Sequence, residues 1–233
     1  MAVGFTQWTV LKHRPIDKLE ANLWHVSGLM KGGNERKMVV AKRSDGDLVI
    51  FNAIALDDAE MAELEAFGKP KYLVIPNAFH RQDALIYKMR YPDIKVIAGA
   101  GAAKGAAKAL PVDMTLDQYK GDGDVQLIAP AGFADKEAML IVKHQGGGQT
   151  VATCDAILNV TSKDVKFPFS FLLAPVDTAS TPRLIRWMML KDKQAWLAQL
   201  AELAGTTTRL IPGHGLILDD APAALRGVSA LLS

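Results

Sequence analysis

Two histidines and two aspartates could together bind a metal ion, although they lie far apart along the chain. The four residues are His80, Asp83, Asp155 and His214. Imidazole and carboxylate ligands suit Zn²⁺, Fe²⁺ or Mn²⁺, and this mixture of nitrogen and oxygen atoms does not choose among the three metals. If only three of the four residues bind the metal, its open position holds a water whose pKa falls toward ~7, which gives a hydroxide nucleophile.

The segment around His214 is the most distinctive of these. It reads Pro212-Gly213-His214-Gly215 and follows a strand-like apolar run directly. Proline stiffens the exit from the strand, and the glycines allow a tight turn because they carry no Cβ. A side chain held that firmly suits a metal ligand, since an ion tolerates little error in ligand position. An ordinary turn histidine after a strand would show the same pattern, so both interpretations stay open at this point.

The other candidate residues also have structural explanations. His80 and Asp83 lie at the start of an expected helix, where the helix dipole favours an acidic side chain. Asp155 could cap a helix or a turn. The only cysteine, Cys154, adjoins an apolar strand and is expected to be a small buried residue rather than a nucleophile.

The elements that must position these residues begin with strands and continue as an alternation of strands and helices, which indicates helices packed on sheets. Strands are predicted at residues 23–29, 37–41, 48–52, 72–76, 94–98, 124–129, 138–144, 150–153 and 209–211. Helices are predicted at residues 57–67, 82–91, 102–110, 181–204 and 221–232. The candidate ligands follow the ends of predicted strands, where ligands gather in α/β folds. The glycines at 99 and 101 lack the spacing of a nucleotide-binding loop, so an alanine-rich helix is expected there.

The composition bounds the class of protein. With 233 residues, 49% hydrophobic and 22% charged, the chain is typical of a globular protein, and we expect a single domain over residues 1–233. A net charge of +2 is too small to indicate a nucleic-acid partner. The first residues lack the pattern of a secretory signal, and the apolar runs fall far short of the roughly 20 residues that span a bilayer. We therefore expect a cytoplasmic protein without a membrane partner.

Taken in order, the motifs resemble those of the metallo-β-lactamase superfamily. Thr153-Cys154-Asp155-Ala156 is similar to its bridging-aspartate motif, and Pro212-Gly213-His214-Gly215 is similar to its final histidine motif. Residues 73–101 look most like a divergent branch of the superfamily. The resemblance covers nearly the whole chain in the order of its elements, and it implies an α/β fold arranged as a four-layer αββα sandwich.

The resemblance also implies an incomplete metal site. The superfamily signature His-x-His-x-Asp-His would fall on residues 78–83, where only His80 keeps its residue type and Ala78 cannot bind a metal. The middle histidine has no counterpart within residues 131–134, and an amide, Asn52, stands near the position of an early aspartate. Too few ligands remain for a two-metal centre.

Two functions from different classes stay open. The first is a hydrolase with one divalent metal, acting on an ester, amide, thioester or phosphoester through His80, Asp155 and His214, with Asp83 as the weakest member of the set. The second is a non-catalytic descendant without a metal, which binds an unidentified small molecule or a protein partner. The apolar helix predicted at 181–204 suits either a contact between two copies of the chain or complete burial, with Trp187, Met188, Met189 and Trp196 as its large apolar residues.

Overall fold

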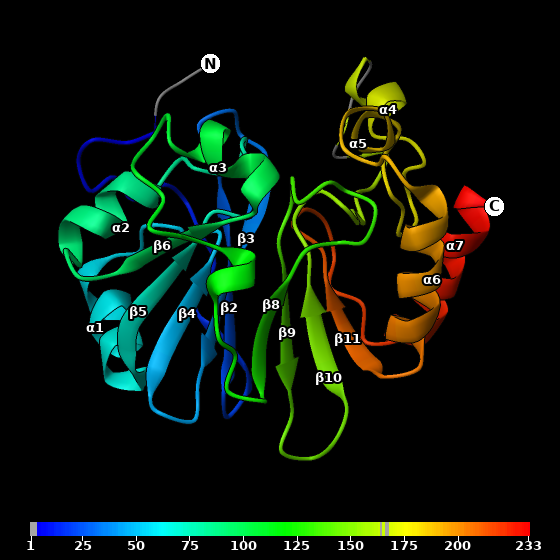
Figure 1. The fold of residues 1–233 in the computed structure, drawn as a ribbon. Coiled ribbons are helices and arrows are strands. Elements are labelled where there is room, and N and C mark those ends of the chain that lie inside the picture. Colours follow the sequence, from blue (N-terminus) through cyan, green and yellow to red (C-terminus); the bar gives the residue numbers. More distant parts are fainter. Residues whose placement is uncertain (1–3, 164, 166–167) are drawn as a thin grey trace.

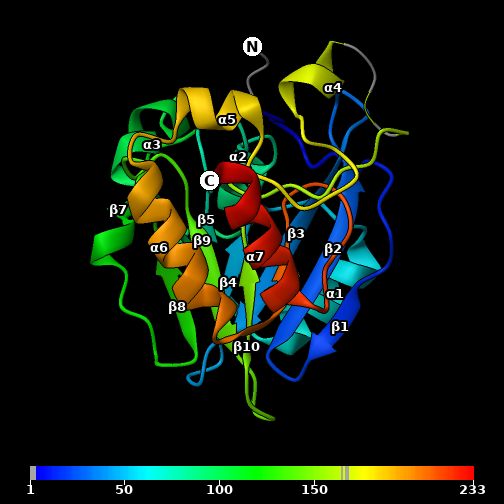
Figure 2. The same ribbon diagram turned by 90° about the vertical axis from the view of Figure 1, so that its right-hand side faces the viewer.

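The chain folds into two β-sheets that pack face to face between two layers of helices (Figure 1). The computed structural model describes residues 4–163, 165 and 168–233. One sheet has seven strands in the order β1-β2-β3-β4-β5-β6-β7, and the other has four in the order β11-β10-β9-β8. Helices α1 and α2 cover the outer face of the larger sheet, while α6 and α7 cover that of the smaller (Figures 1 and 2). The four-layer αββα sandwich predicted from the sequence is confirmed.

The two sheets combine hairpins with parallel crossovers. The strands of the larger sheet are β1 (Asp17–Glu20), β2 (Leu23–Leu29), β3 (Glu35–Lys42), β4 (Asp47–Phe51), β5 (Lys69–Val74), β6 (Lys95–Ala98) and β7 (Met114–Thr115). Those of the smaller sheet are β8 (Val125–Ile128), β9 (Met139–Lys143), β10 (Gln149–Ala152) and β11 (Thr207–Ile211). Strands β1 to β4 pair antiparallel, whereas β4 to β7 pair parallel and β11 joins β10 in parallel. Parallel neighbours place their carboxyl ends at one edge of a sheet, which is where loops carry ligands.

Three of the α-helices in the described part of the chain begin at an aspartate whose side chain accepts from a free backbone N–H group. They are α1 (Asp58–Phe67), α2 (Ala84–Arg90), α3 (Ala100–Ala106), α4 (Phe169–Leu172), α5 (Arg183–Met188), α6 (Lys193–Ala204) and α7 (Ala221–Leu232), with a 3₁₀ turn η1 (Leu116–Gln118). Asp57 and Asp220 cap α1 and α7, each with its side chain accepting a hydrogen bond from the third residue beyond it. Among the described residues, no helix has the length and apolar character required to cross a bilayer.

Three apolar layers hold the sandwich together. On β3, Val39 faces the opposite sheet while its neighbours Met38 and Val40 face the helices, as the two-residue period of a strand requires. Because both faces of this strand are buried, its sequence is an apolar run rather than an alternation. The layer between the sheets includes Leu23, Val39, Val49, Phe51, Val74, Leu140, Val142 and Ile211. The layer under α6 and α7 includes Trp196, Leu200, Leu225 and Val228.

One predicted element is wrong. The single helix expected over residues 181–204 is two helices, α5 and α6, separated by a turn. The backbone N–H groups of Lys191 and Asp192 donate to the carbonyl oxygen of Gly132 at 2.7 and 3.2 Å, which diverts the chain. Asp192 then starts α6, with its side chain accepting from the Ala195 N–H at 3.0 Å. The apolar spacing continues across this break, so the sequence pattern could not reveal it. The short edge strands β1 and β7 were also not predicted.

Candidate metal centre

Three of the four predicted ligands converge from three separate loops. His80 lies between β5 and α2, Asp155 follows β10, and His214 follows β11. Nε2 of His80 lies 3.3 Å from Oδ1 of Asp155 and 3.3 Å from Nε2 of His214. The third side of the triangle, from Nε2 of His214 to Oδ1 of Asp155, is 3.6 Å. The topology has therefore brought together three atoms that can each ligate a metal ion.

The size of this triangle fits a metal ion. Ligand atoms bound to zinc at about 2.0–2.1 Å and at tetrahedral angles lie about 3.3–3.4 Å from one another. The three observed separations are 3.3, 3.3 and 3.6 Å. A carboxylate oxygen and two imidazole nitrogens can each offer a lone pair to one divalent cation placed among them. The residues present thus fit one divalent metal in donor type and in spacing.

His214 is oriented by the backbone around it. Its Nδ1 donates to the carbonyl oxygen of Glu35, which leaves Nε2 as the unprotonated atom that faces the cluster. The turn that carries it is tightly packed, since a Cβ at Gly215 would lie 1.8 Å from the carbonyl oxygen of Asn159. Gly215 also has φ of +88°, in the left-handed region that glycine adopts most easily. Both observations fit the tight turn that the two glycines predict.

Asn77 joins the loop of His80 to Asp155. Its Oδ1 accepts hydrogen bonds from the N–H groups of Phe79 and His80 at 2.9 and 3.2 Å. Its Nδ2 donates to Oδ2 of Asp155 at 2.8 Å, which leaves Oδ1 of Asp155 facing the imidazoles. His80 depends on this loop for its position, because its Nδ1 is buried and has no hydrogen-bond partner within the part of the chain that the structure describes. Asn77 therefore sets the relative position of two of the three candidate ligands.

Glu137 holds the backbone on both sides of Asp155. It is completely buried, and its Oε1 accepts from the backbone N–H groups of Cys154 and Ala156 at 3.1 and 2.7 Å. Burial, together with the nearby charge of Asp155, raises the pKa of Glu137 to about 8. The sequence analysis missed both Glu137 and Asn77. Neither has a spacing signal, because they meet through an isolated β-bridge between residues 60 positions apart.

Asp83, the fourth predicted ligand, lies elsewhere. Its carboxylate forms an ion pair with the guanidinium of Arg36, and both side chains are buried. Arg36 also donates to the carbonyl oxygen of Ala53 at 2.7 Å and to Oδ1 of Asn52 at 3.2 Å. Asp83 is absent from the group whose ligand atoms lie within 4.8 Å of one another. The structure thus pairs Asp83 with a buried cation, outside the triangle of the other three residues, and its assignment as a metal ligand stays a prediction.

The electrostatics of the cluster suit metal ligation. Burial and the neighbouring His80 lower the pKa of His214 to about 4, so this imidazole is neutral at neutral pH. Burial acts to raise the pKa of Asp155, but His80, His214 and the Asn77 amide outweigh it and hold that pKa below its ordinary value. A neutral imidazole and an ionised carboxylate are the forms that bind metals. The side chains of His214 and Asp155 are 16% and 11% exposed, so solvent reaches the cluster.

Comparison with known proteins decides the architecture. No family model and no curated protein matches the sequence. Among solved structures, the metallo-β-lactamase DIM-1 superposes with a TM-score of 0.65 over 96% of this chain and 98% of its own, at 16% sequence identity. The chain has the metallo-β-lactamase fold. DIM-1 exposed to ceftazidime gives a TM-score of 0.60 at 15% identity over 97% of this chain and all of its own, and VMB-1 gives 0.59 at 14% over 96% and 98%.

In this metallo-β-lactamase fold, the Cβ of Ala78 packs against α3. A Cβ added at Gly105 of α3 would lie 2.4 Å from the Cβ of Ala78, so the two backbones are in close contact. Arg81 reinforces the contact by donating to the carbonyl oxygens of Ala78 and Gly105 at 2.5 and 2.6 Å. The loop that carries His80 is thereby fixed to α3 on one side and, through Asn77, to Asp155 on the other.

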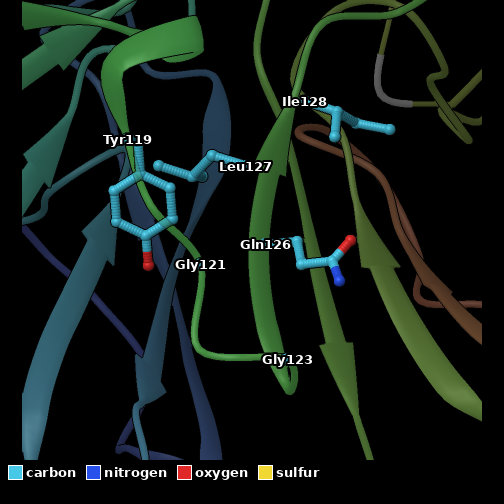
Figure 3. Close-up of a pocket in the computed structure, with 6 residues that line it drawn as sticks. All are labelled: Tyr119, Gly121, Gly123, Gln126, Leu127 and Ile128. Atoms are coloured by element: carbon cyan, nitrogen blue, oxygen red, sulfur yellow. The ribbon is translucent and has the colours of Figure 1, made fainter.

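A surface hollow of about 280 Å³ lies apart from the three candidate ligands, between β8 and the loop that precedes it (Figure 3). It is lined by Tyr119, Gly121, Gly123, Gln126, Leu127 and Ile128. The hydroxyl of Tyr119 already accepts a hydrogen bond from Arg43 at 2.8 Å. The described lining includes no imidazole or carboxylate, the side chains that form the candidate metal centre.

Proposed function

We propose that this protein binds one divalent metal ion through His80, Asp155 and His214, and that it hydrolyses an ester, amide, thioester or phosphoester. The observation that carries the proposal is the triangle of Nε2, Nε2 and Oδ1 atoms, with sides of 3.3, 3.3 and 3.6 Å. Three protein ligands with an open fourth position are typical of catalytic zinc sites, whereas structural sites use four. The metallo-β-lactamase fold supports a metallo-hydrolase-like architecture but does not choose the substrate.

The residues around the triangle would prepare it for this chemistry. When bound, the metal supplies a Lewis acid that polarises a carbonyl or phosphoryl oxygen and acidifies water. The Glu35 carbonyl holds the tautomer of His214 that ligates through Nε2. Asn77 occupies Oδ2 of Asp155 and so directs Oδ1 toward the metal position. These contacts fix the ligands before the metal arrives, which is what outer partners of a metal site contribute.

A non-catalytic role is the second candidate, and a specific observation favours it. Ala78 packs against α3, and the segment 131–134 holds no imidazole, so the ligand set amounts to one half of a two-metal centre. Loss of ligands commonly removes a metal-dependent activity while the fold persists. In that case the site would bind a small molecule or a partner without chemistry.

The metal content of the purified protein distinguishes the metal-dependent hydrolase from the non-catalytic role. The chain, purified without chelators and without a histidine tag, should contain about one equivalent of a transition metal, and His214→Ala should lose it. His144→Ala is the matched control, because His144 bonds Thr150 on the β9–β10 hairpin and should leave the metal content unchanged. Hydrolysis of activated esters, thioesters and phosphoesters that disappears in His214→Ala supports the hydrolase. Absence of metal in wild type after reconstitution, or bound metal without hydrolysis of any substrate class, would overturn it.

A further inference from the structure

Large apolar side chains are exposed on α4 and α5. Phe169 and Phe171 of α4 are 63% and 59% exposed, and Trp187 of α5 is 83% exposed. Helix α4 contains no buried residue, so its phenylalanines contribute nothing to the core. Figure 2 shows α4 as a projection at the end of the molecule where α5 also lies. We call this apolar area, with its surrounding cations, the α4–α5 surface.

The parts of the α4–α5 surface are connected. The guanidinium of Arg183 lies over the ring of Phe171, 4.8 Å from its centroid. Arg183 and Trp187 are four residues apart on α5 and are therefore neighbours on one face of that helix. A cation thus contacts one exposed aromatic ring and lies on the same helix face as another. Alternation of aromatic and basic groups is typical of segments that bind at a membrane interface.

Positive charge is concentrated in the same part of the chain. The segment 161–193 carries six basic and three acidic residues, a net charge of +3, whereas the whole chain carries +2. Two of the acids have structural tasks, since Asp177 accepts from the Ser162 N–H and Asp192 caps α6. Arg183 and Lys191 are exposed, whereas the Nζ of Lys193 donates to the carbonyl oxygen of Leu232 at 3.0 Å. An apolar surface with a surplus of cations is complementary to a partner that is both apolar and anionic.

We propose that the α4–α5 surface binds reversibly to an anionic membrane, with Phe169, Phe171 and Trp187 at the level of the lipid headgroups. A two-fold contact between two copies would bring the surface against itself and oppose like charges, which disfavours a second copy as the occupant. A projecting aromatic segment needs no complementary groove in order to enter the headgroup region of a bilayer. Lysine and arginine beside it add an attraction to acidic lipids that salt weakens. This proposal is independent of the metal site, and it replaces the expectation from the sequence that the protein has no membrane partner.

Trp187 provides a direct probe of binding. The other three tryptophans are shielded, since Trp8 is partly buried and Trp24 and Trp196 are 9% and 0% exposed. We expect the full chain to co-sediment with vesicles of phosphatidylcholine and phosphatidylglycerol in a ratio of about 7:3, with a blue shift of tryptophan emission. Binding should fall at about 0.5 M salt and should be weak with pure phosphatidylcholine. The blue shift should be absent in Trp187→Phe.

Two double variants test which residues contact the vesicles. Phe169→Ala/Phe171→Ala should lower the vesicle partition coefficient by about tenfold or more, whereas Met89→Ala/Leu231→Ala should leave it unchanged. Met89 and Leu231 are 59% and 44% exposed outside the α4–α5 surface, so this pair matches the loss of exposed apolar area. Unchanged thermal unfolding would show that both variants fold. The proposal would be overturned if wild type failed to bind the anionic vesicles, or if both double variants lost binding equally. It would also be overturned if wild type formed a dimer in solution and only the phenylalanine variant were monomeric.

Discussion

Replacement of Asn77 by aspartate changes one side-chain group beside the candidate metal centre, the amide that donates to Asp155 and Glu137. An aspartate at position 77 keeps an oxygen that accepts from the N–H groups of Phe79 and His80, so the local turn survives. Its second oxygen replaces the amide that donates to Oδ2 of Asp155 at 2.8 Å. When ionised, that oxygen cannot donate, and it faces another carboxylate instead. The substitution therefore removes the hydrogen bonds that Nδ2 donates to Asp155 at 2.8 Å and to Oε2 of Glu137 at 3.5 Å, and it adds a repulsion without a change in size.

The expected loss of stability follows from these two effects. A hydrogen bond to a charged group contributes about 1.5–3 kcal/mol. Two buried carboxylates in contact repel, so the new carboxyl has a raised pKa in the folded state. A carboxyl whose pKa is raised by folding does not change the free energy of unfolding at a pH below its pKa in the unfolded chain, about 3.9. It lowers the free energy of unfolding as the pH rises above that value. When protonated, the new carboxyl can donate to Asp155 again, so the deficit should be small at about pH 4 and reach about 3 kcal/mol at about pH 8.

Urea unfolding of the metal-free protein, with chelator present, measures this deficit. Chelator is necessary because a bound cation would offset the added negative charge. Asn34→Asp is the matched control, since Asn34 is exposed and its replacement should change the free energy of unfolding by less than about 0.5 kcal/mol. A deficit for Asn77→Asp below about 1 kcal/mol at about pH 8, or one that does not shrink toward acid pH, would refute the assigned role of Asn77.

Two further predictions concern Asp83 and His214. Asp83→Ala leaves the Arg36 guanidinium buried without its carboxylate and should lower the free energy of unfolding by about 3–5 kcal/mol, with the metal content of the folded protein unchanged. The double variant Asp83→Leu/Arg36→Met should recover most of this loss. Loss of metal without loss of stability would instead identify Asp83 as a ligand. His214, with its pKa lowered from 6.5 to about 4, stabilises the fold above about pH 6.5, and this contribution declines as the pH falls toward 4. Between about pH 7.5 and pH 5, metal-free wild type should therefore lose about 2 kcal/mol more than His214→Gln in urea unfolding, and equal losses would contradict the low pKa.

Local signals in the sequence predicted most of the fold. The Asp45-Gly46 pair predicts the turn between β3 and β4, and Gly46 has φ of +85° there. Strand β2 and helix α7 have the predicted bounds, because turn residues and helix caps mark their ends. The failure at 181–204 has a different cause. That break depends on the carbonyl of Gly132, which lies far away in the sequence, and an apolar period carries no information about such a contact.

The candidate site was predictable only where residue type and strand ends coincide. His80, Asp155 and His214 follow strands and carry ligand atoms, so they could be selected from the sequence. Asp83 shares these properties, yet the structure pairs it with Arg36, 47 positions earlier in the chain, and no local pattern shows a counter-ion at that distance. Glu137 has the opposite problem, since a buried carboxylate that holds backbone N–H groups looks like an ordinary surface residue in the sequence.

The contact between Ala78 and Gly105 determines how this scaffold could be re-engineered. A histidine introduced at position 78 would extend toward α3, because the Cβ of Ala78 already meets the helix at Gly105. A designer who wants a metal ligand at position 78 would have to shift or shorten α3 first, and Arg81 holds that helix to the loop. The position of α3, as well as the residue type at position 78, thus stands against a metal ligand at that point of the loop, and a point substitution alone would not supply one.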